Sequence, residues 1–368
     1  MSTINFLFYP PELTRYPCLT MCVNHSVVEN DSNINLNDPE TWVYRFESFN
    51  DSAQFVFSCM FFGTGFLGGV GNILTIFIFA KMGWTNTFHI SCTALAVSDL
   101  CCVLAIAMTG VTSMGIFNQN FNRSPIYYLC NIAGVVFSRT TAVLTAWISL
   151  ERCLSVIFPI KVKLIITRTV TVVSNVIIFI TSVSIIGFIF ASFQFFKEVD
   201  NKTNSSSMVL IDGEQPELNG FREFSKLLLG AVVPIFSWVT VIICTAFLIV
   251  KMRNSRKWRK VNAWAVQKGV VTTSKNQLLP VREKRAIKVV LAVAVLFLIC
   301  SLPMSVHLMV SFFIEDYFRN GSLHYVFNFN AMVVLFLSQV NSCINIIVYT
   351  LLGHIFRSVL FRLFCGGD

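Results

Sequence analysis

Residues 325–352 read YVFNFNAMVVLFLSQVNSCINIIVYTLL, and this stretch decides the fold. It is long enough and apolar enough to cross a lipid bilayer as one helix, which takes about 20 residues. Ser338, Asn341, Ser342, Asn345 and Tyr349 nevertheless recur at helical spacing, so they lie along one face. Polar side chains within lipid tend to face the interior of a helix bundle. The stretch therefore predicts one helix of a larger membrane bundle.

The composition also indicates a membrane protein. Hydrophobic residues make up 55% of the chain and charged residues 13%, whereas about a quarter of the residues in a globular domain are charged. Because lipid-exposed backbone must be hydrogen-bonded within its own helix, we predict an all-α membrane protein, a seven-transmembrane helix bundle. The seven predicted spans are residues 55–81, 88–115, 127–158, 168–193, 222–251, 285–312 and 325–352.

Three regions follow from these spans. Residues 1–54 form an extracellular N-terminal segment, residues 55–352 the seven-transmembrane domain, and residues 353–368 an amphipathic helix with a short cytoplasmic tail. The apolar residues of GHIFRSVLFRLF (353–364) recur at helical spacing, which predicts a short eighth helix on the inner leaflet. Cys365 directly after it is a palmitoylation candidate or a free tail cysteine.

Two patterns give the same membrane orientation. Successive connecting segments lie on opposite sides of the membrane. Those on the side of the C-terminal tail hold 19 of the 28 Lys and Arg residues and three acidic residues, and a basic excess marks the cytoplasmic side. The segments on the opposite side hold every Asn-x-Ser/Thr site, and glycosylation is lumenal. We therefore expect a multi-pass plasma membrane protein with its N-terminus outside and its C-terminus inside, and no nucleic-acid partner. The glycosylation candidates are Asn24, Asn30, Asn50, Asn122, Asn201, Asn204 and Asn320.

Polar groups from four spans lie at one depth. At about 1.5 Å per residue from the cytoplasmic ends, Asn72, Asp99, Thr141 and Asn341 all lie roughly 14–16 Å deep. A lone asparagine could simply join two helices, but a carboxylate together with hydroxyls and amides predicts a hydrated cluster able to hold a sodium ion. No other cofactor is expected. The predicted sodium and water cluster is Asn72, Asp99, Thr141, Asn341, Ser342 and Asn345.

The segment SLERCLSVIFPIK (149–161) ends the third span at the cytoplasm. Glu151 and Arg152 there could form an interfacial pair in which the arginine snorkels. Alternatively, Arg152 bridges to Glu283 at the inner end of the sixth span and is released when the bundle opens. Such a latch needs a hinge, and Pro303 supplies one because it removes a backbone donor mid-helix.

These residues carry a family resemblance along the whole membrane portion. The chain resembles the rhodopsin-like (class A) G-protein-coupled receptors, and within them most resembles the molluscan chemosensory receptors. The segments that carry it, in order, are GN (71–72), LAVSDL (95–100), SLERC (149–153), FLICSLP (297–303) and NSCINIIVY (341–349).

The resemblance implies roles for particular residues. Arg152 falls on the arginine that engages the G-protein, Glu283 on its inactive-state partner, and Tyr349 on the tyrosine that swings inward on activation. Phe297 and Pro303 fall on the sixth-helix signature. The sodium and water site of the family falls on Asp99, Thr141, Asn341, Ser342 and Asn345.

The chain also departs from the family pattern. Ile346 replaces the seventh-helix proline, Ser301 the sixth-helix tryptophan and Cys153 the tyrosine after arginine. The loop at about 194–221 has no cysteine, so the usual bridge to the third helix cannot form. These departures bear on sodium binding and on the details of the activation switch.

Ligand recognition is expected in the outward half of the bundle, where concave sites form between helices. Arg139 in the third span could pair with Asp99, donate to backbone carbonyls, or anchor an acidic ligand group. His307 and Gln339 are further pocket candidates or bystanders. Gly134 stands where amine receptors of this family keep an aspartate, which argues against a biogenic amine.

The sequence predicts a receptor and not an enzyme. It would convert binding of an extracellular small molecule or peptide into activation of a heterotrimeric G-protein, with arrestin and membrane lipid as further partners. A chemosensory role is preferred, with a neuropeptide (FMRFamide-like) receptor as the alternative. An ion-coupled transporter is the alternative of a different class, since Asp99 and Arg139 are ionisable groups within the membrane.

Overall fold

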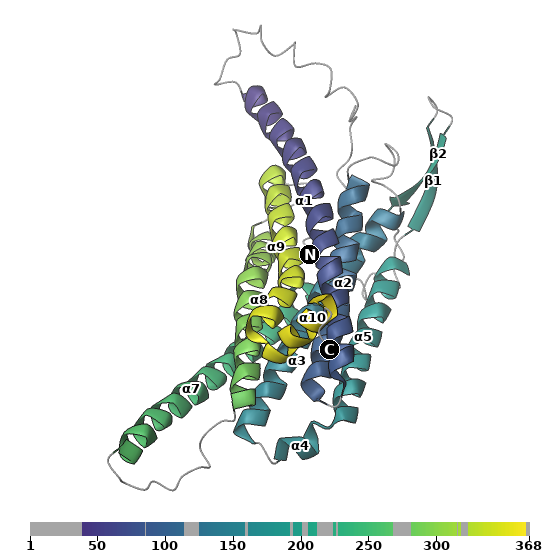
Figure 1. Cartoon of the computed structure of the whole chain (residues 1–368). Coiled ribbons are helices and arrows are strands. Elements are labelled where there is room, and N and C mark those ends of the chain that lie inside the picture. The colour runs from purple at the N-terminus through teal and green to yellow at the C-terminus, as the bar shows by residue number, and fades with distance from the viewer. Residues whose placement is uncertain are drawn as a thin grey trace.

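The computed structural model describes residues 39–84, 86–113, 125–158, 161–191, 194–200, 205–211, 224–225, 227–267, 281–314, 316–317 and 323–365. Seven helical segments in these residues are long and apolar enough to cross a membrane, which confirms the predicted seven-helix bundle. Figure 1 shows the long helices running side by side, with α7 extending beyond the bundle at one end and a β-hairpin lying at the other. The membrane-spanning segments are 52–82, 87–113, 125–157, 168–191, 228–254, 287–307 and 325–352.

The helices of the bundle run in chain order. They are α1 (Pro39–Met82), α2 (Thr87–Ser113), α3 (Pro125–Ile157), α5 (Arg168–Ala191), α7 (Val233–Gln267), α8 (Val281–Phe313) and α9 (His324–Leu352). Short elements join or follow them: α4 (Lys161–Ile165), the π-helix η2 (Leu228–Val232) and α10 (His354–Cys365).

One element departs from the all-α prediction. Strands β1 (Gln194–Asp200) and β2 (Ser205–Ile211) pair in antiparallel register between α5 and α7, within a segment predicted as a loop. A hairpin satisfies its own backbone hydrogen bonds, which an irregular segment outside the bundle would have to satisfy with water. The bundle itself remains entirely helical.

Glycines let α1 approach two neighbouring helices closely. A Cβ at Gly65 would collide with Ala107 on α2, and a Cβ at Gly68 would overlap the Cys343 thiol on α9. A Cβ at Gly71 would come within 3.1 Å of Ile346 on α9. Small residues at such positions let membrane helices pack backbone to backbone. This face of α1 holds α9 at a fixed distance.

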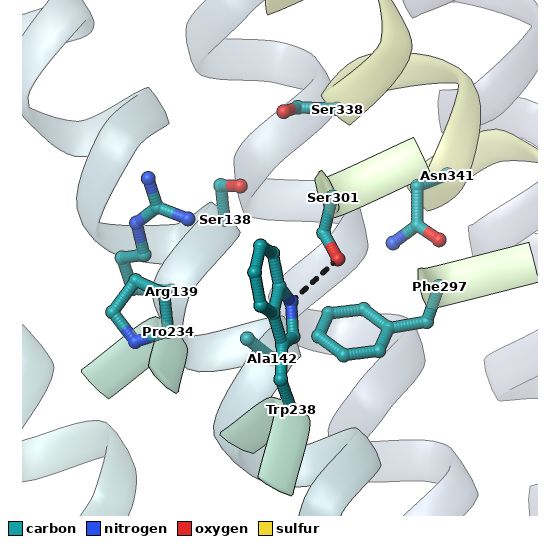
Figure 2. A pocket seen from close by; sticks show the side chains of 9 residues that line it. All are labelled: Ser138, Arg139, Ala142, Pro234, Trp238, Phe297, Ser301, Ser338 and Asn341. Carbon is teal, nitrogen blue, oxygen red and sulfur yellow. Dashed lines mark hydrogen bonds between the residues drawn. The ribbon is translucent and has the colours of Figure 1, made fainter. Parts of the chain in front are cut away.

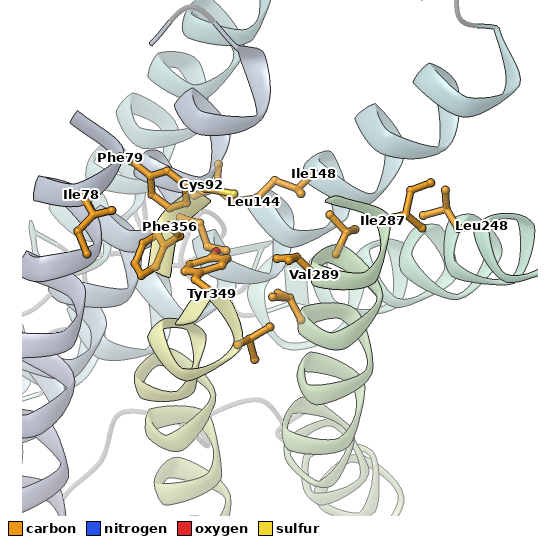
Figure 3. Packing of buried hydrophobic residues seen from close by; sticks show 14 of the residues in the cluster. Ile78, Phe79, Cys92, Leu144, Ile148, Leu248, Ile287, Val289, Tyr349 and Phe356 are labelled. Atoms are coloured by element: carbon orange, nitrogen blue, oxygen red, sulfur yellow. The ribbon is translucent and has the colours of Figure 1, made fainter. Parts of the chain in front are cut away.

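The largest buried cluster lies between α1, α2, α3, α7, α8, α9 and α10 (Figure 3). Phe79, Tyr349 and Phe356 form its aromatic part, with ring centroids 5.4–5.6 Å apart in each pair. Offset and edge-on ring contacts of this kind add to the burial of apolar area. They attach α10 to both α1 and α9.

Gly353 separates α9 from α10. Its N–H donates to the Tyr349 carbonyl at 2.8 Å, which closes α9. A Cβ at Gly353 would meet that same carbonyl oxygen at 2.5 Å, so the sharp turn requires glycine. The turn delivers Phe356 to Phe79, and the predicted short eighth helix follows as α10.

Candidate functional site

Asp99 on α2 is fully buried and its carboxylate joins three helices. Thr141 on α3 donates its hydroxyl to Oδ1 at 2.8 Å, and Asn345 on α9 donates Nδ2 to Oδ2 at 2.7 Å. Ser98 donates to the Phe137 carbonyl at 3.2 Å and lies 3.1 Å from the Thr141 hydroxyl. Through its two hydrogen bonds with Thr141 and Asn345, Asp99 joins α2 to both α3 and α9.

The structure brings most of the predicted sodium and water cluster together. Asn72 on α1 donates to the carbonyl of Ser342, at 3.0 Å, on the same helix as Asn345. Asn341 has no described hydrogen bond to these residues, and it lines the cavity that Arg139 also lines.

The donor set around Asp99 suits a hard cation in part. Carboxylate and hydroxyl oxygens are the ligands that such cations take in proteins, and Asp99, Ser98 and Thr141 supply them. Asn345 presents its amide nitrogen to the carboxylate in this arrangement. Sodium binding at Asp99 stays a prediction.

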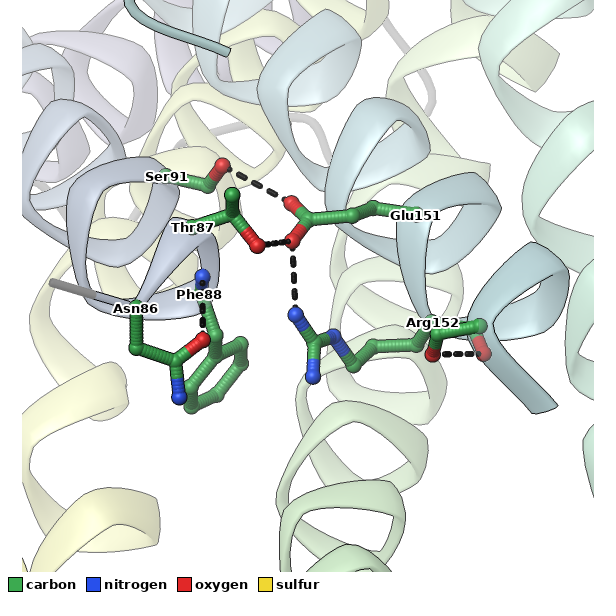
Figure 4. A network of polar contacts seen from close by, with 7 residues as sticks. Asn86, Thr87, Phe88, Ser91, Glu151 and Arg152 are labelled. Atoms are coloured by element: carbon green, nitrogen blue, oxygen red, sulfur yellow. Dashed lines mark hydrogen bonds and ion pairs between the residues drawn. The ribbon is translucent and has the colours of Figure 1, made fainter. Parts of the chain in front are cut away.

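Glu151 collects three donors at the inner end of α3 (Figure 4). Thr87 and Ser91 on α2 both donate their hydroxyls to its carboxylate, Ser91 at 3.0 Å, and Arg152 donates Nη2 to Oε1 at 2.6 Å. The Arg152 guanidinium also lies 4.9 Å from the centre of the Phe88 ring. An ionic contact with Glu151 on its own helix and an aromatic contact with Phe88 on α2 therefore hold Arg152 at the inner end of the bundle.

Two partners were predicted for Arg152, and the structure describes the contact with one of them. The interfacial pair with Glu151 is present. The alternative partner, Glu283, lies in α8, but its side chain is outside the described residues. The latch between Arg152 and Glu283 stays a prediction.

Tyr349 does not contact Arg152 among the contacts described for this region. Its ring packs on Phe79 and Phe356. It also lines a small cavity between α2, α3, α8 and α9, together with Phe88, Cys92, Leu95, Thr145, Ile148, Ser149, Val289, Val290 and Val293.

A second cavity lies deeper in the bundle, between α3, α7, α8 and α9 (Figure 2). Arg139 lines it and is 6% exposed. The indole N–H of Trp238 donates to the Ser301 hydroxyl at 2.9 Å. Ser301 stands where the family keeps its sixth-helix tryptophan, so an indole from α7 now fills the space beside it. The other lining residues are Ser138, Ala142, Pro234, Phe297, Ser338 and Asn341.

His307 has a full set of neighbours near the end of α8. Its Nδ1 lies 2.8 Å from the Tyr317 hydroxyl, which also accepts from Asn330 at 2.8 Å. Phe327 on α9 stacks against the imidazole with centroids 4.8 Å apart. His307 therefore joins α8 to α9 and to the segment between them, and it does not line either cavity described above.

Gln339 is fully buried in the interface of α1 and α9. It donates Nε2 to the Phe61 carbonyl at 2.9 Å and accepts from the Thr64 hydroxyl at 3.0 Å. Both ends of the amide are satisfied within the protein. The structure thus places Gln339 in helix packing and not among the residues that line the Arg139 cavity.

Several predicted modification sites cannot be described. Asn50 lies in α1, but its side chain and that of Cys365 in α10 are outside the described residues. The remaining glycosylation candidates also lie outside the described residues, namely Asn24, Asn30, Asn122, Asn201, Asn204 and Asn320. These sites stay predictions.

Sequence reasoning missed the α2 partners of Glu151. Thr87 and Ser91 are four residues apart, so they share one helical face at the inner end of α2. That spacing was a usable signal. The sequence signal for Trp238 as a residue that lines the cavity was weaker, since Trp238 simply lies one turn after Pro234 within an apolar span.

Comparison with known proteins identifies the class. Residues 71–349 match the 7 transmembrane receptor (rhodopsin family). The chain is also 22% identical over 310 residues to the type-1 angiotensin II receptor A of Xenopus laevis, covering 82% of this chain and 77% of the relative. The chain therefore belongs to the rhodopsin family of seven-transmembrane receptors. It is a G-protein-coupled receptor of the membrane, and not an enzyme.

Proposed function

We propose that this receptor is chemosensory and is activated by a small extracellular molecule with an acidic group. The support is Arg139, a buried guanidinium in the middle of the bundle. Guanidinium suits carboxylate recognition. On this proposal the N-terminus lies outside the cell, so that ligand enters from the end opposite to Glu151 and Arg152.

We propose that a movement of α8 transmits ligand binding to the G-protein. Ligand must bind the open arrangement more tightly than the closed one to shift the population. The single observation that carries this proposal is the closed contact of Arg152 with Glu151 and Phe88, which keeps the arginine from a G-protein. Opening at Pro303 would move the inner end of α8 outward and give a G-protein access to Arg152. Arrestin and the inner leaflet are proposed as further partners of the same surface.

Arg152→Ala tests this assignment. The variant should reach the cell surface but fail to stimulate guanine-nucleotide exchange, while the substitution of exposed Arg168 by Ala, at the start of α5, should leave exchange intact. Normal guanine-nucleotide exchange with Arg152→Ala would contradict the proposal. Glu283→Ala should raise basal exchange if Glu283 restrains Arg152, and an unchanged baseline would remove the latch.

A peptide receptor is the second candidate. The similarity to an angiotensin II receptor favours it, and an FMRFamide-like neuropeptide remains the specific alternative. A screen of acidic small molecules and short peptides, using a promiscuous G-protein and calcium readout, separates the two. An ion-coupled transporter instead predicts tracer uptake that is lost in Asp99→Asn.

A further inference from the structure

Arg139 has no counterion among the described residues. Its side chain is 6% exposed and its Nε, fully buried, has no hydrogen-bond partner. Asp99, the carboxylate considered for it, instead accepts from Thr141 and Asn345. The described ion pair within 4.0 Å belongs to Arg152 and Glu151. The backbone carbonyls near Arg139 accept no described hydrogen bond from it either.

A buried guanidinium in this position is costly. Arginine cannot lose its proton in a protein, and an unpaired buried charge costs several kcal/mol. Something must therefore compensate the charge from within the cavity. The cavity holds about one water molecule, so the compensating group must be small.

The residues that line the cavity favour a negatively charged compensating group. The lining contains no Asp or Glu among its described residues. Ser301 accepts the Trp238 N–H, so its own hydrogen is available to donate elsewhere. Ser138 and Asn341 add a hydroxyl and an amide from α3 and α9. A site built from one cation and several donors repels a second cation and attracts an anion.

We propose that this cavity is an internal binding site for a small monovalent anion, chloride under ordinary salt conditions. The anion neutralises Arg139 and takes further hydrogen bonds from hydroxyl and amide donors of the lining. Because the lining comes from α3, α7, α8 and α9, a bound anion stabilises the closed arrangement of these helices. This site is separate from the Asp99 cluster but shares Arg139 with the acidic ligand proposed above, so the anion would have to leave before that ligand binds.

The first test measures thermal stability of the purified full-length receptor in lipid nanodiscs. Sodium chloride is exchanged for sodium gluconate at constant sodium and ionic strength, so that any cation at Asp99 is unaffected. The Tm should rise with chloride and reach a plateau, and gluconate, which is too large for the cavity, should give no rise. Equal Tm values of the wild type in both salts would overturn the proposal.

Substitution places the effect at Arg139. Arg139→Gln should remove the chloride dependence of the Tm, whereas Arg168→Gln, at an exposed position on α5, should keep it. Ser138→Ala should weaken the chloride response severalfold without removing it. A response that survives Arg139→Gln would place the anion elsewhere. Sodium formate is tested in the same way as a small carboxylate. A rise in Tm with formate but not with chloride would overturn the assignment of chloride.

Trp238 supplies a second readout that needs no Arg139 variant. Iodide quenches indole fluorescence on contact, so an occupied cavity should give a saturable quenching component in the wild type. That component should disappear in Trp238→Phe and should compete with chloride. Quenching that is linear in iodide and unchanged by Trp238→Phe would contradict an anion in this cavity.

Discussion

The carboxylate of Glu151 depends on α2 as much as on its own helix. Thr87 and Ser91 donate to it from successive turns of α2, and Arg152 shares the oxygen that Thr87 uses. The arginine that we propose for G-protein coupling is therefore held indirectly by two hydroxyls.

Thr87→Val tests this indirect hold. Loss of one hydrogen bond of about 1 kcal/mol should raise basal guanine-nucleotide exchange by up to roughly fivefold. Thr93→Val is the matched control on the same helix, because Thr93 donates to the His89 carbonyl and does not touch Glu151. A similar rise in both variants would show that the effect comes from α2 stability.

The pair formed by Asp99 and Asn345 can be tested by exchange. Asn345→Asp alone opposes two buried carboxylates and should lower the Tm of the purified receptor by several degrees. Asp99→Asn combined with Asn345→Asp reverses the pair and should recover most of the loss, with Thr141 still bonded to residue 99. A double variant no better than Asn345→Asp would argue against a direct pair.

At the scale of elements, the packing of α1 on α9 depends on glycines. Gly68→Ala places a methyl group on the Cys343 thiol, and overpacking of this kind costs about 1–3 kcal/mol. Thermal unfolding should detect this loss. Gly63→Ala is the control on the same helix, since its methyl group meets nothing within 4 Å and helix propensity alone favours alanine by about 0.5–1 kcal/mol.

A second substitution tests whether the loss in Gly68→Ala comes from the contact with Cys343. Cys343→Ala removes the thiol that a Gly68 methyl group would meet, so Gly68→Ala should be better tolerated in that background. If the two substitutions simply add, the predicted contact is wrong.

The helices were predictable because lipid leaves the backbone few choices. Each span was found to within six residues, with the start of the fifth predicted too early and the end of the sixth too late, and the depth of Asp99, Thr141 and Asn72 placed them near one another. The paired strands β1 and β2 lie outside the bundle, where that constraint does not hold. Side-chain direction was also hidden, since depth alone does not show that Asn341 lines the same cavity as Arg139.

At the scale of the whole molecule, hydrogen bonds attach α9 to α1 along much of its length. Gln339 bonds to Phe61 and Thr64, Cys343 lies 3.4 Å from the Thr64 carbonyl, and Asn72 bonds to Ser342. Domain movements need a surface that can slide or rotate. The bonds between α1 and α9 make that pair the fixed part of the bundle.

Distance measurements between spin labels test which helices move. A pair at Lys81→Cys and Leu352→Cys, on the exposed inner ends of α1 and α9, should keep its distance when an agonist binds. A pair at Lys81→Cys and Lys288→Cys should lengthen, because Lys288 lies on α8. Both pairs need a background without the exposed Cys59. Lengthening of the first pair would contradict a fixed α1 and α9.

Ile346 has a consequence for exchange with solvent. A proline there would remove one amide hydrogen and leave a carbonyl one turn earlier without its donor, but α9 runs from His324 to Leu352 as one helix. Water then finds no opening in the backbone between Gln339 and Tyr349. In deuterium oxide, the amides of this segment should exchange at one slow common rate, with no fast site near residue 346. The seventh helix would behave as a single cooperative unit of local opening.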